Sequence, residues 1–135
     1  MEFDGNMPSG ESMTRQFLYG QLYFLEKFGN ISNVFFLPDT FGYSAQLPQI
    51  AKNAGAEYFV TIKIAWSNFN KFPNHTFNWV GIDGSTLFCH FPPADTYLSN
   101  GSVSEVISNI TNFKDKGRSD CTMLLFGEGD GGGGP

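Results

Sequence analysis

The chain has 135 residues, of which 41% are hydrophobic, so it is long enough to bury the core of one small domain but not of two. Its formal net charge is −5, and its 8 Lys and Arg residues are scattered singly. Without a basic stripe, a nucleic-acid partner is not expected. The longest apolar runs, 34–37 and 123–126, are far shorter than the roughly 20 residues of a membrane helix, so no membrane span is expected either.

The first predicted element is a helix over residues 9–28. Its apolar residues recur close to one helical face: Met13, Phe17, Phe24 and Phe28. Gly29 and Asn30 follow directly, and both residue types are typical just after the end of a helix. We therefore expect an amphipathic helix that packs through this face.

The next three elements alternate strand, helix and strand. Residues 34–37 are apolar without alternation, which is typical of a strand buried on both faces. Residues 44–54 then predict a helix, with Gly55 as its left-handed stop. Residues 58–62 predict a second buried strand.

A hairpin is predicted after these elements. Residues 77–80 and 86–91 are rich in apolar and β-branched types, and they flank a turn-rich tetrad at 81–84. We interpret this antiparallel hairpin as an insertion into the fold and not as part of its main sheet.

The last predicted elements are a helix and a strand. Ser102 and Glu105 have the spacing of a capping box, which predicts a helix up to about residue 113. Residues 122–126 then predict a third buried strand. Buried strands that alternate with helices favour an α/β fold with a parallel sheet, either an open doubly wound sheet or part of a barrel.

Cysteines and histidines give little sign of a local metal or disulfide framework. We expect Cys89 and Cys121 to be buried free thiols, because Cys is among the most buried residue types. His75 and His90 have no familiar metal-ligand spacing, which favours structural roles. Four glycosylation sequons would be used only in the secretory pathway, and they leave the compartment open: Asn30, Asn74, Asn100 and Asn109.

Three polar residues follow the predicted parallel strands. Asp39 comes after the first, Lys63 closes the second, and Asp130 lies just past the third. Ligand sites of parallel sheets form at these carboxyl ends, and two carboxylates there can serve as nucleophile and general acid/base in glycoside hydrolysis. From position alone, the alternative stays open that Asp39 only caps a turn and that Asp130 is a solvated loop residue.

Two further patterns in the sequence are less specific. The glycines of segment 127–132 match a dinucleotide fingerprint, but the glycine-rich composition makes such a match weak and no helix follows. Several aromatic residues near the predicted rim are suited to stacking on sugar faces, although core packing is the commoner role of such residues. These are Phe41, Tyr43, Trp66, Trp79 and Tyr97.

The segment Leu37–Gln49, which reads LPDTFGYSAQLPQ, closely resembles the nucleophile motif of the glycoside hydrolase family 38 α-mannosidases. The likeness extends in order along the whole chain. Further stretches look like the cytosolic and vacuolar branch of that family: 1–12, 71–73, 90–97, 114–118 and 129–135.

This resemblance implies a fold and an activity. The fold would be α/β, as part of a parallel-stranded (β/α) barrel of the glycoside hydrolase/deacetylase type, with residues 1–135 as a partial N-terminal catalytic domain. The activity of the parent would be hydrolysis of terminal α-linked mannose from oligosaccharides or N-glycans, by a retaining, metal-assisted mechanism. A mannose-containing oligosaccharide is then the expected partner, and the cytoplasm the expected location, with the vacuole or lysosome as the alternative.

The resemblance also assigns residues. The catalytic nucleophile falls on Asp39, which in the family also contributes an oxygen to a zinc ion, and the acid/base falls on Asp130. Phe41 matches a residue beside the bound sugar, and Lys63 a position where some relatives carry an Arg near the substrate. We add Tyr97, an aromatic residue near the rim, as a third candidate for substrate binding.

The zinc site is the departure from the family pattern. Relatives complete it with a His-x-Asp pair upstream and a His downstream, and neither is present in this sequence. Because a divalent cation needs about four ligands, Asp39 alone would bind it negligibly. We therefore expect an internal fragment whose isolated chain is inactive. An inactive truncated product or a non-catalytic sugar-binding remnant is the alternative.

Overall fold

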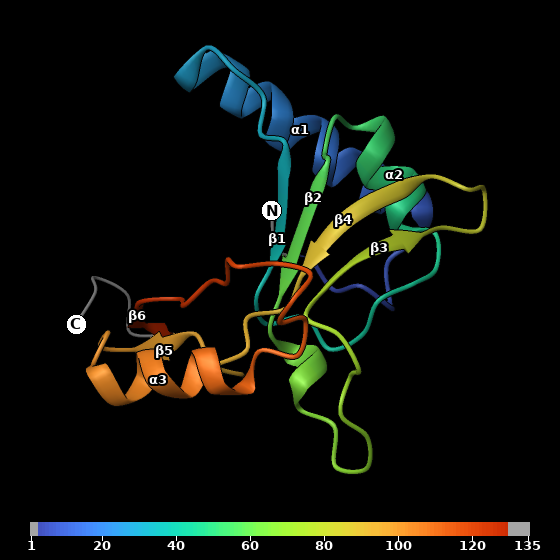
Figure 1. Cartoon of the computed structure of the whole chain (residues 1–135). Coiled ribbons are helices and arrows are strands. Elements are labelled where there is room, and N and C mark those ends of the chain that lie inside the picture. Colours follow the sequence, from blue (N-terminus) through green and yellow to red (C-terminus); the bar gives the residue numbers. More distant parts are fainter. Residues whose placement is uncertain (1–2, 130–135) are drawn as a thin grey trace.

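The computed structural model describes residues 3–129, which form a mixed α/β unit around a four-stranded sheet (Figure 1). The strand order is β1-β2-β4-β3. The strands are β1 (Val34–Leu37), β2 (Tyr58–Thr61), β3 (Thr76–Val80) and β4 (Thr86–His90). β2 pairs parallel with β1 on one side and with β4 on the other, whereas β3 pairs antiparallel with β4.

The third parallel strand is therefore β4, and two predictions about it were wrong. The hairpin is not an insertion, because its second strand closes the parallel part of the sheet. Residues 122–126 do not form a strand. The two segments differ in burial. Leu87 and Cys89 of β4 are fully buried, whereas Met123 and Phe126 are 38% and 64% exposed.

Local signals set the end of α1 and the start of α3 as predicted. In α1 (Gly10–Phe28), Ser9 caps the first turn through its side chain and Gly29 ends the helix in the left-handed conformation, with φ of 74°. In α3 (Val103–Asn112), both hydrogen bonds of the Ser102–Glu105 capping box are present.

The buried face of α1 differs in part from the prediction. Met13 and Phe17 are buried, but the next buried residue is Gln21, and Phe24 and Phe28 are 38% and 66% exposed. The Gln21 side-chain amide donates to two backbone carbonyls, so a polar residue is satisfied at this position. The last two turns of α1 leave the core.

One face of the sheet carries the core. α1 and α2 (Leu47–Asn53, shorter than the predicted 44–54) lie on the same side of the sheet in Figure 1. The buried residues that cluster there come from both helices, the strands and the chain leading to them: Phe3, Met13, Phe17, Phe35, Leu37, Leu47, Ala51, Ala56, Phe59, Leu87, Cys89 and Phe91.

The opposite face of the sheet is apolar but exposed. The strand at 34–37 was expected to be buried on both faces, yet it alternates: Phe35 and Leu37 are buried, whereas Val34 and Phe36 are 45% and 39% exposed. Tyr58 of β2 and Phe88 of β4 continue this exposed face.

A second, smaller layer lies beyond the carboxyl ends of the parallel strands. It contains α3 and a two-stranded antiparallel ladder of β5 (Leu98–Ser99) and β6 (Gly127–Glu128), as Figure 1 shows. None of the helices described here has both the length and the apolar character needed to cross a membrane.

The two cysteines are free but differ in their surroundings. Cys89 is buried in the core, as predicted, and its burial raises the pKa of the thiol to about 12. Cys121 is exposed, so the prediction for it was wrong. It follows the exposed Asp120, whose side chain accepts a contact from its thiol at 3.2 Å.

Candidate active site at the strand ends

Three chain segments converge where the parallel strands end. Asp39 comes just after β1, Lys63 begins the 3-10 helix η1 (Lys63–Ala65) just after β2, and Tyr97 follows β4. The parallel pairing of β1, β2 and β4 brings these three segments to the same edge of the sheet. The structure thus gathers three of the residues that the sequence singled out.

Asp39 is held at one of its two carboxylate oxygens. Lys63 Nζ lies 2.6 Å from Asp39 Oδ1, and the Tyr97 hydroxyl donates to the same oxygen at 3.1 Å. The two partners differ in burial, since the Lys63 side chain is 4% exposed and that of Asp39 is 46% exposed. A buried cation is therefore matched to a carboxylate that solvent reaches.

This pairing fixes the charge of both groups. The hydrogen bond from Lys63 lowers the pKa of Asp39, against the opposing effect of burial, and the Tyr97 hydroxyl lowers it further. Burial of Lys63 acts to lower its own pKa, but the hydrogen bond and charge of Asp39 outweigh it and the pKa is raised. Asp39 is thus an anion and Lys63 a cation around neutral pH.

Aromatic rings surround the ammonium group of Lys63. Its Nζ lies 3.1 Å from the ring centroid of Trp66, 5.0 Å from that of Phe41 and 5.5 Å from that of Tyr97. Residues three apart eclipse in a 3-10 turn, which explains why Trp66 lies over Lys63. Phe41 is 69% exposed beside Asp39, so a face of its ring is open to solvent.

The loop that carries Asp39 is clamped by the N-terminal segment of the chain. The Thr40 hydroxyl donates to the Phe3 carbonyl at 3.0 Å, in a buried bond. The Asn6 side-chain amide donates to the Phe41 carbonyl, also at 3.0 Å. Both residues that follow Asp39 are therefore fixed by a segment far away in sequence.

Gly42 completes this clamp. Its φ is 131°, a backbone conformation that only glycine adopts without strain, and a Cβ built there would lie 1.7 Å from Asn6 Nδ2. On the other side of the loop, the hydroxyls of Tyr43 and Thr61 are hydrogen-bonded to each other. The loop after β1 is thus attached to the N-terminal segment and to β2.

A small cavity of about 220 Å³ lies between the clamp and Asp39, lined by Phe3, Asp4, Asp39, Thr40 and Phe41. Asp4 has a structural task there, because its Oδ1 accepts from the backbone amides of Asn6 and Met7 at 2.7 and 2.9 Å. Within residues 3–129, no three His, Cys, Asp or Glu side chains gather as a metal ion requires. The described residues around Asp39 therefore do not fit a complete zinc site.

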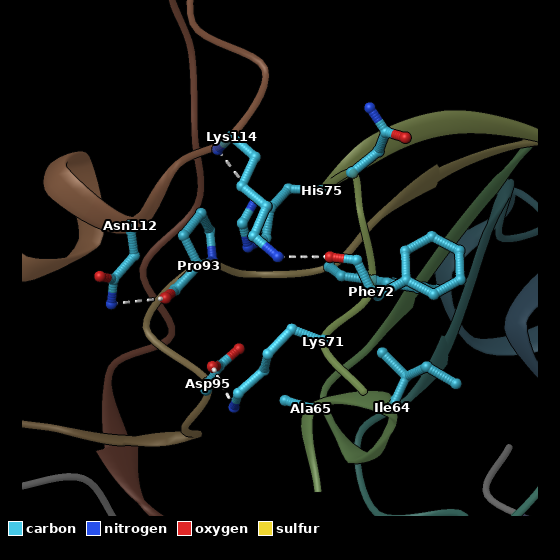
Figure 2. A pocket seen from close by; sticks show the side chains of 11 residues that line it. Ile64, Ala65, Lys71, Phe72, His75, Pro93, Asp95, Asn112 and Lys114 are labelled. Carbon is cyan, nitrogen blue, oxygen red and sulfur yellow. Dashed lines mark hydrogen bonds and ion pairs between the residues drawn. The ribbon is translucent and has the colours of Figure 1, made fainter. Parts of the chain in front are cut away.

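A larger cavity, of about 340 Å³, adjoins the same segments and is shown in Figure 2. Its lining begins directly after Lys63 and reaches the loop before Tyr97. The lining residues are Ile64, Ala65, Lys71, Phe72, Asn74, His75, Phe91, Pro93, Asp95, Asn112 and Lys114.

His75 lines this cavity, and both histidines of the chain accept hydrogen bonds from backbone amides. His75 Nδ1 accepts from the Lys114 backbone amide at 3.1 Å, and His90 Nε2 accepts from the Met123 amide at 3.2 Å. Burial lowers the pKa of both rings, which are therefore neutral at pH 7. These contacts agree with the structural roles expected for them.

The candidate site contains residues that the sequence did not single out, and one predicted site residue lies outside the described part of the chain. Asp130, the expected acid/base, lies outside the described residues. The clamp formed by Asn6 and Gly42 was not foreseen, because its contacts join residues about 35 positions apart. Trp66 was noted only as one of several aromatic residues, and its spacing of three from Lys63 was the available signal.

Comparison with known proteins gives the chain its family. Residues 1–135 match the family described as glycosyl hydrolases family 38 N-terminal domain. Over all 135 residues, the chain is 58% identical to alpha-mannosidase G of Dictyostelium discoideum, 56% to alpha-mannosidase 2C1 of Homo sapiens and 48% to alpha-mannosidase of Saccharomyces cerevisiae. It spans 12%, 13% and 12% of the length of these relatives, respectively. The chain belongs to the N-terminal domain of glycosyl hydrolase family 38.

Proposed function

We propose that the natural polypeptide that carries this chain hydrolyses terminal α-linked mannose, with Asp39 as the nucleophile. The observation that carries the proposal is the state of Asp39, an ionised and half-exposed carboxylate held by Lys63 and Tyr97 at the strand ends. The family and the names of the relatives, which are alpha-mannosidases, supply the substrate class.

The contacts of Asp39 suit an attacking carboxylate. Lys63 and Tyr97 both contact Oδ1, so Oδ2 is the oxygen suited to attack the anomeric carbon of mannose. Attack forms an ester between Asp39 and the sugar and breaks the bond to the leaving oxygen, which takes a proton from a general acid. We assign that acid to Asp130, which then activates the water that hydrolyses the ester.

The remaining chain residues bind and orient. Phe41, exposed beside Asp39, offers a ring face to the sugar, and Tyr97 orients the carboxylate through its hydroxyl. Lys63 keeps Asp39 ionised in the free site and stabilises the carboxylate when the ester breaks down. Two successive displacements at one carbon give net retention of configuration.

Three further features belong to the proposal. Zinc binding remains part of it through Asp39, although the described residues around this carboxylate do not complete a ligand set. The parallel strands β1, β2 and β4 are compatible with part of a (β/α) barrel. A mannose-containing oligosaccharide is the proposed substrate, and a cytoplasmic location remains a prediction.

The test uses the natural polypeptide that carries residues 1–135, with and without Asp39→Asn. We expect it to release mannose from an aryl α-mannoside with the α anomer as the first product, seen by NMR. Asp39→Asn lowers kcat by about 10³-fold or more, because the nucleophile is lost. Inverted product, or activity retained in the variant, would contradict the proposal. Mannose binding without turnover in the unaltered protein would favour a non-catalytic sugar-binding role.

A further inference from the structure

Trp66 covers the buried ammonium group of Lys63. It follows η1 directly, and its backbone amide donates to the Lys63 carbonyl at 3.0 Å, which closes the turn that joins the two residues. The Lys63 Nζ lies 3.1 Å from the centroid of the indole ring. Trp66 is 63% exposed, whereas the Lys63 side chain is 4% exposed. The indole therefore stands between the ammonium group and solvent.

The other two rings near Lys63 Nζ lie farther away. The centroids of Phe41 and Tyr97 are 5.0 and 5.5 Å from it, near the outer limit of roughly 6 Å for a cation–π contact. Among aromatic side chains, indole also offers a cation the most favourable ring face. Trp66 therefore makes the strongest of the three contacts with the ammonium group.

Trp66 also contacts the loop that carries Asp39. Its ring lies edge-on to that of Phe41, with the centroids 6.4 Å apart and the planes at 71°. Phe41 follows Asp39 by two residues. The indole thus packs on the cation of the ion pair and on the loop that holds its anion, and it joins the segment after β2 to the segment after β1.

Loss of the indole face would loosen the ion pair for two reasons. A lysine side chain has four rotatable carbon–carbon bonds, so Nζ reaches other positions once the ring no longer confines it. Water would also contact Nζ, and it would weaken the attraction between the two charges, which lie 2.6 Å apart. Oδ1 of Asp39 would then depend more on the Tyr97 hydroxyl, which donates to it at 3.1 Å.

We propose that Trp66 is a positioning residue for the reaction at Asp39, because it holds the ammonium group of Lys63 against Oδ1. This inference rests on the proposed function, in which Oδ2 attacks the anomeric carbon. With Oδ1 held, Oδ2 keeps its direction toward the sugar. A misplaced nucleophile lowers the rate of attack more than it lowers sugar binding. The effect of Trp66 should therefore appear in kcat and should depend on Lys63.

The experiment uses the natural polypeptide that carries the chain, with an aryl α-mannoside whose leaving group is poor enough that attack by Asp39 limits kcat. Trp66→Leu removes the ring face and keeps an apolar side chain, whereas Trp66→Phe keeps a smaller ring face. Phe69→Leu is the matched control, because Phe69 is 95% exposed in the loop that follows η1.

We expect Trp66→Leu to lower kcat about tenfold, as loss of a cation–π contact with a desolvated cation does, and to leave KM within about twofold. Trp66→Phe should recover part of this loss, and Phe69→Leu should leave both constants within about twofold. A rise in KM at unchanged kcat would show that Trp66 binds the sugar directly. That result overturns the inference and leaves the proposed function intact.

A double-mutant cycle shows whether Trp66 acts through Lys63. Lys63→Met keeps a long side chain and removes its charge. In this background Trp66→Leu should change kcat by less than about twofold, because the ammonium group that the ring holds is absent. An equal loss of about tenfold in both backgrounds would show that Trp66 acts by another route, and it would overturn the inference.

Labelling of lysines tests the same contact without turnover. Acetylation by acetic anhydride is followed by mass spectrometry, with the exposed Lys52 of α2 as the internal reference. Relative to Lys52, we expect Lys63 to react about tenfold faster in Trp66→Leu than in the unaltered protein, since the lost contact raises the population of exposed amine. Unchanged labelling overturns the inference. An unaltered protein without turnover contradicts the proposed function, and faster labelling then still supports the contact of Trp66 with Lys63.

Discussion

Two carboxylates of this chain, Asp39 and Asp115, have lowered pKa values for different reasons. Asp39 is paired with a cation, and its side chain is 46% exposed. Asp115 is 3% exposed, and its burial acts to raise the pKa. Hydrogen bonds to Asp115 outweigh this effect, from the Asn74 side chain and from the amides of Thr76 and His75 at 2.7, 2.9 and 2.6 Å.

The comparison teaches how the proposed nucleophile differs from a structural carboxylate. The direction of the pKa shift is the same for both, so it does not separate them. The partners do: Asp115 accepts bonds at both oxygens and joins the start of β3 to the loop after α3, whereas both contacts of Asp39 are to one oxygen. Asp39 is the more exposed of the two, and its Oδ2 is not used by Lys63 or Tyr97, which suits the role proposed for it.

The largest expected effect on stability follows from Asp115. Asp115→Ala leaves three N–H donors without an acceptor, and we expect it to lower the free energy of unfolding by about 3 kcal/mol. Thermal melting of the natural polypeptide, with amide exchange at His75 and Thr76, measures this. Asp39→Asn is the matched variant, and we expect it to shift Tm less: its side-chain oxygen still accepts from Lys63, so the cost is limited to the lost counter-charge of the buried ammonium group. Equal Tm shifts in the two variants would contradict the view that Asp115 stabilises the fold more than Asp39 does.

A smaller effect is expected at the clamp next to Asp39. Gly42→Ala strains the backbone and displaces Asn6, and we expect a loss of about 2 kcal/mol together with reduced kcat. Gly84→Ala is the control, since Gly84 also has a positive φ, of 86°, but no atom lies within 4 Å of a Cβ added there, apart from its chain neighbours. Gly84→Ala should lower the free energy of unfolding by about 1 kcal/mol, and this loss measures the backbone strain alone. Matching losses in melting experiments would show that the Asn6 contact is unimportant.

The smallest effect is a dependence of stability on pH. The lowered pKa values of His75 and His90 contribute stability that is present above the unfolded value of about 6.5. It is lost as pH falls through the folded values, because the unfolded chain takes up the protons first. Asp39 loses its contribution as pH falls from the unfolded value through its lowered folded pKa, and Lys63 loses its contribution as pH rises from the unfolded value through its raised folded pKa, so neither changes in the pH range of this experiment. Melting at pH 7.5, 6.5 and 5.5 should show this decline, and His75→Gln should reduce it; an unchanged profile would contradict this origin.

Elements with local signals were predictable from the sequence. The end of α1 and the start of α3 depend on residues within one turn, and both were placed correctly, from Gly29 and from the Ser102–Glu105 box. Strand partners depend on contacts between distant residues. The segments 86–91 and 122–126 are both apolar, and only tertiary packing selects the first as the third parallel strand.

The candidate site also has a part that was predictable from the sequence and a part that was not. The positions of Asp39 and Lys63 follow from the rule that strand ends of a parallel sheet share an edge, and the structure brings them to 2.6 Å. The clamp at Asn6 and Gly42 follows no local pattern, because the N-terminal segment reaches the loop only in the folded chain. The role of Asp130 stays a prediction.

The direction of β4 also decides where the molecule accepts a label. The turn at 81–84 precedes β4, so it lies at the end of the sheet opposite Asp39, about 17 Å away along the five residues of the strand. Figure 1 shows it projecting from the sheet, and Ile82 there is 73% exposed. A fluorophore or epitope inserted at this turn would report on the protein without reaching Asp39 or the cavities beside it.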